Sequence, residues 1–190
     1  IVADFRTALR LTLGLEGGYS DDPLDSGGKT NWGVTEAQAR AYGYIGPMER
    51  LPFETAENIC LEEYWNVNRL SQVANQEVAY NIFDCGVNCG VGTAAKMIQR
   101  TLNLLNDRGT KWPDLKVDGV LGKVTLTTLN NINFRRDAKA TTKAVLKIFN
   151  VLRGGHYVDC CEKREANEKF MLGWVLNRIM LDVREEEEYG

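Results

Sequence analysis

The chain of 190 residues lacks three features that would point to particular functions. It has no excess of basic residues, because 23 Lys and Arg stand against 26 Asp and Glu and give a net charge of −3. Proteins that bind nucleic acid or anionic surfaces through charge are usually basic, so we expect neither partner. No segment approaches the roughly 18 consecutive apolar residues of a membrane-spanning helix. Residues 1–15 lack the basic region and small-residue cleavage site of a secretory signal, so we expect synthesis in the cytoplasm.

Metal-binding residues are also scarce. His156 is the only histidine, and the five cysteines include no pair with the C-x2-C spacing of structural zinc sites. A zinc site could be assembled from His156 together with Cys85, Cys89, Cys160 and Cys161, but the spacing favours small, buried side chains instead. We therefore expect no metal. With an odd number of cysteines, at least one has no partner within the chain, and their spacing does not resemble a disulfide framework. We therefore expect synthesis in a reducing compartment.

Apolar residues recur at helical spacing and predict an all-α protein. The predicted helices cover residues 4–16, 35–43, 54–66, 76–89, 94–106, 123–131, 137–153 and 164–182. Asp4, Thr35 and Thr93 are candidate N-caps, and Gly154-Gly155 is a candidate stop for the seventh helix.

The character of the sequence changes near residue 75. We therefore expect two packed helical lobes, residues 1–75 and 76–183, followed by an acidic tail at 184–190. Turn signals within residues 19–34 allow a short β-hairpin.

The densest run of turn-forming residues follows the first helix and reads Glu16-Gly-Gly-Tyr-Ser-Asp-Asp-Pro-Leu-Asp25-Ser-Gly-Gly-Lys-Thr30-Asn-Trp-Gly-Val-Thr35. Cleavage of a glycosidic bond needs a general acid and a second carboxylate. Glu16 is the candidate acid, because the negative end of a helix disfavours its charged form and should raise its pKa. Asp25 is the candidate partner, and Thr30 the candidate for holding a water. The alternative is that Glu16 is a solvated helix end and Asp25 a turn former.

Two aromatic residues of the same run, Tyr19 and Trp32, are candidate surfaces on which a sugar ring would stack. Aromatic side chains are as often packed against the core, and the sequence leaves both interpretations open.

The run from Leu15 to Thr35 closely resembles the signature of glycoside hydrolase family 108, the lysozyme-like N-acetylmuramidases of bacteriophages and prophages. Its Glu-x8-Asp-x4-Thr spacing is also similar to the catalytic constellation of the T-even-phage lysozymes, with one residue fewer before the Thr. A second segment that resembles the family is Ala79-Tyr-Asn-Ile-Phe-Asp84-x3-Asn88-x-Gly90, and it makes Asn88 a candidate substrate-binding residue.

The second lobe resembles the predicted peptidoglycan-binding region that accompanies this family. The matching segments are Ala94-Ala-Lys-Met-Ile-Gln99-Arg100, Asp118-Gly-Val-Leu-Gly122-x-x-Thr125-Leu126 and Phe170-x-x-Gly173-Trp174-x3-Arg178. Cys85 and Cys89 depart from the pattern, since small or apolar residues are expected there.

The resemblance implies a lysozyme-like fold with a cleft between the lobes, with Glu16 as the catalytic acid. It implies a hydrolase of peptidoglycan that cleaves the β-1,4 bond from N-acetylmuramic acid to N-acetylglucosamine and needs no cofactor. The implied role is a phage endolysin, a monomer made in the host cytoplasm that acts on periplasmic peptidoglycan. Two alternatives stay open: a lytic transglycosylase that uses Glu16 alone, and a non-catalytic wall-binding or secretion-associated protein.

Overall fold

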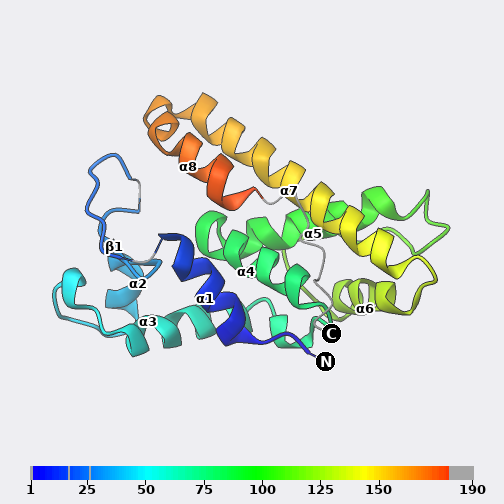
Figure 1. The fold of residues 1–190 in the computed structure, drawn as a ribbon, viewed down its shortest axis with the longest axis horizontal. Coiled ribbons are helices and arrows are strands. Elements are labelled where there is room, and N and C mark those ends of the chain that lie inside the picture. Colours follow the sequence, from blue (N-terminus) through cyan, green and yellow to red (C-terminus); the bar gives the residue numbers. More distant parts are fainter. Residues whose placement is uncertain (1, 17, 26, 180–190) are drawn as a thin grey trace, which may run out of the picture.

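The computed structural model describes residues 2–16, 18–25 and 27–179, and for residues 14–16 it describes the backbone alone. Within these residues the protein has eight α-helices and one two-stranded antiparallel sheet (Figure 1). The predicted all-α, lysozyme-like class with a short hairpin is therefore confirmed. The helices are α1 (Phe5–Glu16), α2 (Glu36–Ala41), α3 (Phe53–Cys60), α4 (Gln76–Cys89), α5 (Val91–Leu105), α6 (Lys123–Asn131), α7 (Ala138–Lys163) and α8 (Glu168–Arg178). The strands are β1 (Thr30–Asn31) and β2 (Val34–Thr35).

Helix α4 lies at the centre of the molecule. Elements α1, α2, α3 and β1 gather on one side of it, and α5, α6, α7 and α8 on the other (Figure 1). Both polar and apolar residues of α4 are buried, including Asn81, Phe83 and Asp84, because neighbouring helices cover it on several sides. It contacts α1 as well as α5 and α7. The lobe boundary near residue 75 stays a prediction, and α4 is the element that joins the two parts.

Three aromatic rings fix α1 against α4. Phe5 contacts Trp65 and Phe83 edge to face, with centroids 5.6 and 5.8 Å apart, and Trp65 contacts Phe83 at 5.7 Å. Such pairs each stabilise a fold by about 0.5–1.5 kcal/mol beyond the area that they bury. Trp65 belongs to a π-helical segment, Leu61–Asn66, which follows directly on α3. The two segments together cover the predicted helix 54–66.

Two of the three predicted caps are confirmed. The Asp4 carboxylate accepts the Thr7 N–H at 2.7 Å, and Thr35 forms a full capping box with Gln38 at the start of α2. The prediction for Thr93 is wrong, because α5 already begins at Val91. Gly90 separates α4 from α5 with φ of 90°, a conformation that strongly favours glycine.

The predicted stop at Gly154-Gly155 is also wrong, since α7 runs on to Lys163. A Cβ on Gly154 would lie 3.1 Å from Cδ1 of Ile179, so this glycine allows a close approach at the end of α8. Arg153 and Tyr157, before and after the two glycines, are both buried, and their packing keeps this part of α7 helical. The acidic tail at 184–190 lies outside the described residues.

None of the helices in the described ranges has the length and apolar character needed to cross a membrane.

Candidate active site

Helix α1 ends at Glu16, the candidate acid. The helix is amphipathic, with Ala8, Leu9 and Thr12 buried, so its position is set by packing well before its last turn. The side chain of Glu16 lies outside what the structure describes. The backbone therefore places Glu16 at the start of the turn-rich run, and its role as acid stays a prediction.

The turn-rich run is closed into a loop by a pair of backbone hydrogen bonds. The Ser20 N–H donates to the Thr30 carbonyl at 2.9 Å, and the Thr30 N–H donates to the Ser20 carbonyl at 2.8 Å. Thr30 also pairs with Thr35 in the hairpin of β1 and β2. The segment that carries Asp25 is thus held at both ends, and its base lies only four residues after the end of α1.

Asp25 lies within this loop and is half-buried. Its Oδ1 accepts the Gly27 N–H at 2.8 Å, and its own N–H donates to the Asp22 carbonyl at 2.9 Å. A Cβ on Gly27 would lie 3.3 Å from that Oδ1, so a glycine there lets the turn close tightly. One carboxylate oxygen of Asp25 is therefore used to form the turn, and within the described residues Oδ2 accepts no hydrogen bond.

The two aromatic candidates differ in their surroundings. Tyr19 has 39% of its surface exposed and its hydroxyl donates to Oδ2 of Asp21 at 3.4 Å. Desolvation, followed by the negative charge of Asp21, raises the pKa of Tyr19. Trp32 instead packs edge to face on Phe53 with centroids 5.5 Å apart, and its Nε1 donates to the Leu51 carbonyl. Tyr19 is therefore the more exposed of the two rings, and the substrate-binding role of each stays a prediction.

The backbone of Trp32 adopts a strained conformation. It occupies the left-handed region, with φ of 53°, and it is followed by Gly33 with φ of 75°. Two consecutive positive φ angles form the tight turn that suits a two-residue hairpin, but a bulky residue in the first position is strained. The contacts of the Trp32 ring with Phe53 and Leu51 offset that strain and fix the hairpin on the core.

Asn88, the third candidate for substrate binding, lies on α4 and contacts α7. Its Oδ1 accepts the hydroxyl of Tyr157 at 2.6 Å. The Tyr157 hydroxyl in turn accepts a hydrogen bond from Nε of Arg153 at 2.8 Å. The structure thus brings Tyr19, Asp25 and Thr30 together in one loop and places Asn88 within a separate polar network between the helices.

The centre of that network is Asp84, which has no exposed surface. Arg153 donates from Nη2 to Oδ2 of Asp84 at 2.7 Å, and Arg178 forms a second ion pair with Oδ1. Burial is the largest single effect and lowers the pKa of Arg153, but Asp84 and the other negative groups around the guanidinium together outweigh it, so the net shift is upward. Sequence reasoning missed this network. The available signal was a charged residue on the apolar stripe of each helix, Asp84 on α4 and Arg153 on α7.

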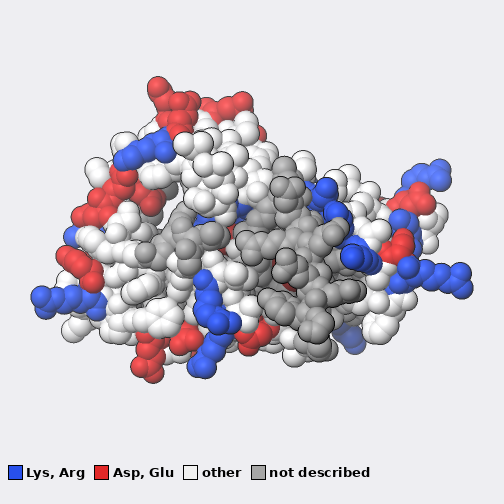
Figure 2. All heavy atoms as spheres, viewed as in Figure 1, with Lys and Arg blue, Asp and Glu red and all other residues white. Residues whose placement is uncertain are grey.

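The loop is also tied to the second lobe. Nζ of Lys169, on α8, donates to Oδ2 of Asp22, which lowers the pKa of Asp22 together with the hydrogen bond from the Leu24 N–H. Figure 2 shows acidic side chains gathered at the end of the molecule that holds β1 and the junction of α7 and α8.

A cluster of thiols lies beside the network. Cys89 is half-buried, and hydrogen bonding from Cys85 lowers its pKa to about 5 against the opposing effect of burial, with a further contribution from His156. Cys160 Sγ lies 3.6 Å from Nε2 of the same histidine. The expectation of small, buried cysteines holds for Cys60 and Cys85, while the other three are half-buried. Among the described residues, no three His, Cys, Asp or Glu side chains are grouped to hold a metal ion.

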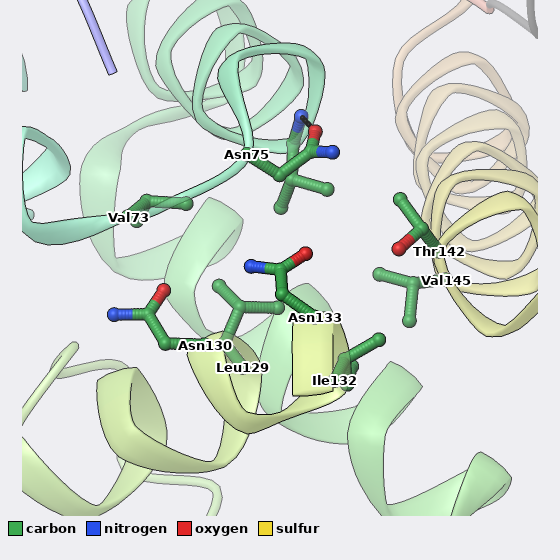
Figure 3. Close-up of a pocket in the computed structure, with 9 residues that line it drawn as sticks. Val73, Asn75, Leu129, Asn130, Ile132, Asn133, Thr142 and Val145 are labelled. Atoms are coloured by element: carbon green, nitrogen blue, oxygen red, sulfur yellow. Dashed lines mark hydrogen bonds between the residues drawn. The ribbon is translucent and has the colours of Figure 1, made fainter. Parts of the chain in front are cut away.

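A small cavity lies far from the loop, between residues 73–78, the end of α6 and the start of α7. Figure 3 shows Asn75, Asn130, Asn133 and Thr142 around it. Its volume is about 10 Å³, which is room for one water molecule and far too little for a sugar ring. Asn130 there accepts the Ala74 N–H at 2.9 Å, so the cavity marks a structural junction.

Two family models match the chain in succession. Residues 9–90 match the model described as glycosyl hydrolase 108, and residues 93–179 match the model described as a predicted peptidoglycan domain. Among solved structures, SagA of Brucella abortus is similar, with 23% sequence identity and a TM-score of 0.60 over 92% of this chain and 95% of that chain. At this identity the likeness shows the fold alone. No curated protein matches the chain.

Proposed function

Because residues 9–90 belong to the glycosyl hydrolase 108 family and residues 93–179 to the predicted peptidoglycan domain, we propose that the protein is an N-acetylmuramidase. It cleaves the β-1,4 bond between N-acetylmuramic acid and N-acetylglucosamine in peptidoglycan. The observation that carries this proposal is the loop that begins at the end of α1. Closure by Ser20 and Thr30 sets the base of this loop four residues after the helix end that bears Glu16, and the loop carries Asp25.

In this mechanism Glu16 protonates the leaving oxygen of the glycosidic bond. The position at a helix C-terminus favours its protonated form before reaction, because the negative end of the helix dipole opposes a carboxylate. Asp25 supplies the second carboxylate through Oδ2, while Oδ1 keeps the loop in its conformation. The Thr30 hydroxyl positions water, and the exposed ring of Tyr19 supports a sugar.

The biological role that we propose is lysis of a bacterial host by a phage. The protein is made in the cytoplasm as a monomer and acts on periplasmic peptidoglycan as an endolysin. A catalytic region followed by a peptidoglycan domain supports this role, because the second region can hold the enzyme on the polymer that the first one cuts.

One observation favours a second candidate, a lytic transglycosylase. That enzyme needs no second carboxylate, and Oδ1 of Asp25 is already engaged by the Gly27 N–H. A transglycosylase would use Glu16 alone and leave 1,6-anhydro ends.

Mass spectrometry of fragments released from purified Gram-negative sacculi separates these functions. A muramidase yields fragments with reducing N-acetylmuramic acid ends. Anhydro ends would replace the proposal by the transglycosylase, and bound protein without released fragments would leave a non-catalytic wall-binding protein.

A further inference from the structure

A groove in the second lobe lies apart from the loop that carries Asp25. It runs between α5 and α7 beside Val117 and has a volume of about 400 Å³. That volume lies within the roughly 300–1,000 Å³ of small-molecule sites. Two of its apolar walls, Val117 and Val151, are 41% and 56% exposed, so the groove offers uncovered apolar surface next to its polar groups.

The groove is more basic than the protein as a whole. Lys96 and Arg100 lie one turn apart on α5, both exposed, and neither forms an ion pair with any described residue. His156 lines the opposite wall, and hydrogen bonding with Cys89 raises its pKa against the effect of burial. Asp159 is the one acidic residue of the lining. This surface therefore attracts anions, in a chain whose net charge is −3.

The alkyl chain of Lys96 packs against a glycine of the neighbouring loop. A Cβ on Gly119 would lie 3.2 Å from Cε and 3.5 Å from Cγ of Lys96, so the alkyl chain of Lys96 lies against this glycine. Gly119 has φ of 81° and is fixed by Gln99, whose Oε1 accepts the Gly119 N–H at 3.0 Å. Nε2 of Gln99 also donates to Oδ1 of Asp118 at 2.9 Å. A lysine whose alkyl chain is packed in this way loses less conformational entropy on binding an anion.

Peptidoglycan presents two chemically different parts, neutral sugar rings and short peptides that carry several carboxylates and alanine methyl groups. Exposed cations beside exposed valines match the peptides in both charge and polarity, whereas neutral sugar rings gain nothing from Lys96 and Arg100. We propose that the groove between α5 and α7 binds the carboxylates of the peptide stem of peptidoglycan. This inference rests on the proposed function for the identity of the polymer.

The test compares binding to two probes: intact sacculi, and sacculi whose peptide carboxylates have been converted to neutral amides with a carbodiimide and ammonia. The first variant is the double substitution Lys96→Glu with Arg100→Glu. Its matched control is Lys139→Glu with Lys143→Glu, which changes the net charge equally at exposed positions near the start of α7. We expect the groove variant to bind intact sacculi about tenfold or more weakly than wild type, and the control to bind within about twofold of it.

A second variant changes shape without charge. Gly155 lies on α7 in the groove lining and has nothing within 4 Å of its Cβ position, so Gly155→Leu fills the groove without a clash at the Cβ. Gly155→Ala is its control, and the leucine variant alone is expected to bind intact sacculi more weakly.

The proposal is overturned if both groove variants bind intact sacculi as wild type does, or if wild type binds the amidated sacculi as tightly as intact sacculi. Its failure is separate from that of the enzyme. Wild-type protein that binds through the groove but releases no fragments would contradict the proposed hydrolase and support the groove.

Discussion

Asp84 and Arg153 form an ion pair in which both side chains are 0% exposed, with Nη2 of Arg153 2.7 Å from Oδ2 of Asp84. The pair joins α4 to α7 through two residues that are 69 positions apart in the sequence. Nη1 of Arg153 also donates to the Arg178 carbonyl at 3.0 Å, which brings the end of α8 to the same point. One carboxylate thus holds three helices together.

Asp84→Asn is expected to destabilise the protein by about 3–5 kcal/mol, because removal of one partner of a buried ion pair leaves uncompensated charge. Urea unfolding followed by circular dichroism measures the change. Glu36→Gln is the matched control, since its pair with Arg40 is exposed and should contribute less than about 1 kcal/mol. Equal effects of the two substitutions would show that Asp84 is not the centre of the network.

Asp25→Asn separates the charge of Asp25 from its role in the turn. The amide oxygen of asparagine still accepts the Gly27 N–H, so the loop is expected to keep its conformation and the protein its melting temperature. If Asp25 is the second carboxylate, the rate of fragment release falls by about 100-fold or more.

Asp25→Ala is the companion substitution. It removes the charge and also the hydrogen bond, so it should lose a further ~1 kcal/mol of stability. Near wild-type activity in Asp25→Asn, with a large loss only in Asp25→Ala, would assign Asp25 to the turn alone.

Cys89 is expected to react with iodoacetamide at a pH where ordinary thiols do not. Its pKa of about 5 makes it largely thiolate at pH 6.5, whereas an unperturbed thiol titrates near ~8.5. Burial raises the pKa of Cys60 to about 12, so that thiol should stay unmodified. Peptide mapping by mass spectrometry identifies the residue that is labelled first.

His156→Asn tests one contribution to that reactivity, which is smaller than that of the hydrogen bond from Cys85. The histidine lowers the pKa of Cys89, so its removal should raise that pKa and slow labelling at pH 6.5 while leaving labelling at pH 9 little changed. Labelling of Cys160 before Cys89 in the wild-type protein would contradict the assignment.

Much of the fold could be predicted because local patterns and packing agree. Helical periodicity predicted α4 over 76–89 and α6 over 123–131, and the structure has these same bounds. The capping signal at Thr35 was likewise read correctly, because a capping box is formed by neighbours in the sequence.

The errors arise where tertiary contacts decide. Gly154 resembles a helix stop, but its function is to allow Ile179 to approach, and Ile179 is 25 residues away. The same holds for Asp84 and Arg153, whose pairing depends on how α4 and α7 cross. The contact of Trp32 with Phe53 was not visible in the sequence either, and the substrate-binding role of Trp32 stays a prediction.

The candidate catalytic residues were found through their order in one short run, which folding keeps together. Their roles stay predictions, because a carboxylate at a helix end and a carboxylate in a turn are common features without catalysis. Asn88, a candidate identified by resemblance, lies against Tyr157 in the network between the helices, and its substrate-binding role stays a prediction.

The most direct test of the account is the activity of Glu16→Gln on purified sacculi beside wild type, with Glu54→Gln, an exposed carboxylate of the first lobe, as control. The account predicts that wild type and Glu54→Gln release fragments with reducing N-acetylmuramic acid ends, while Glu16→Gln melts normally and releases none. Release of the same fragments by Glu16→Gln at the wild-type rate would contradict it.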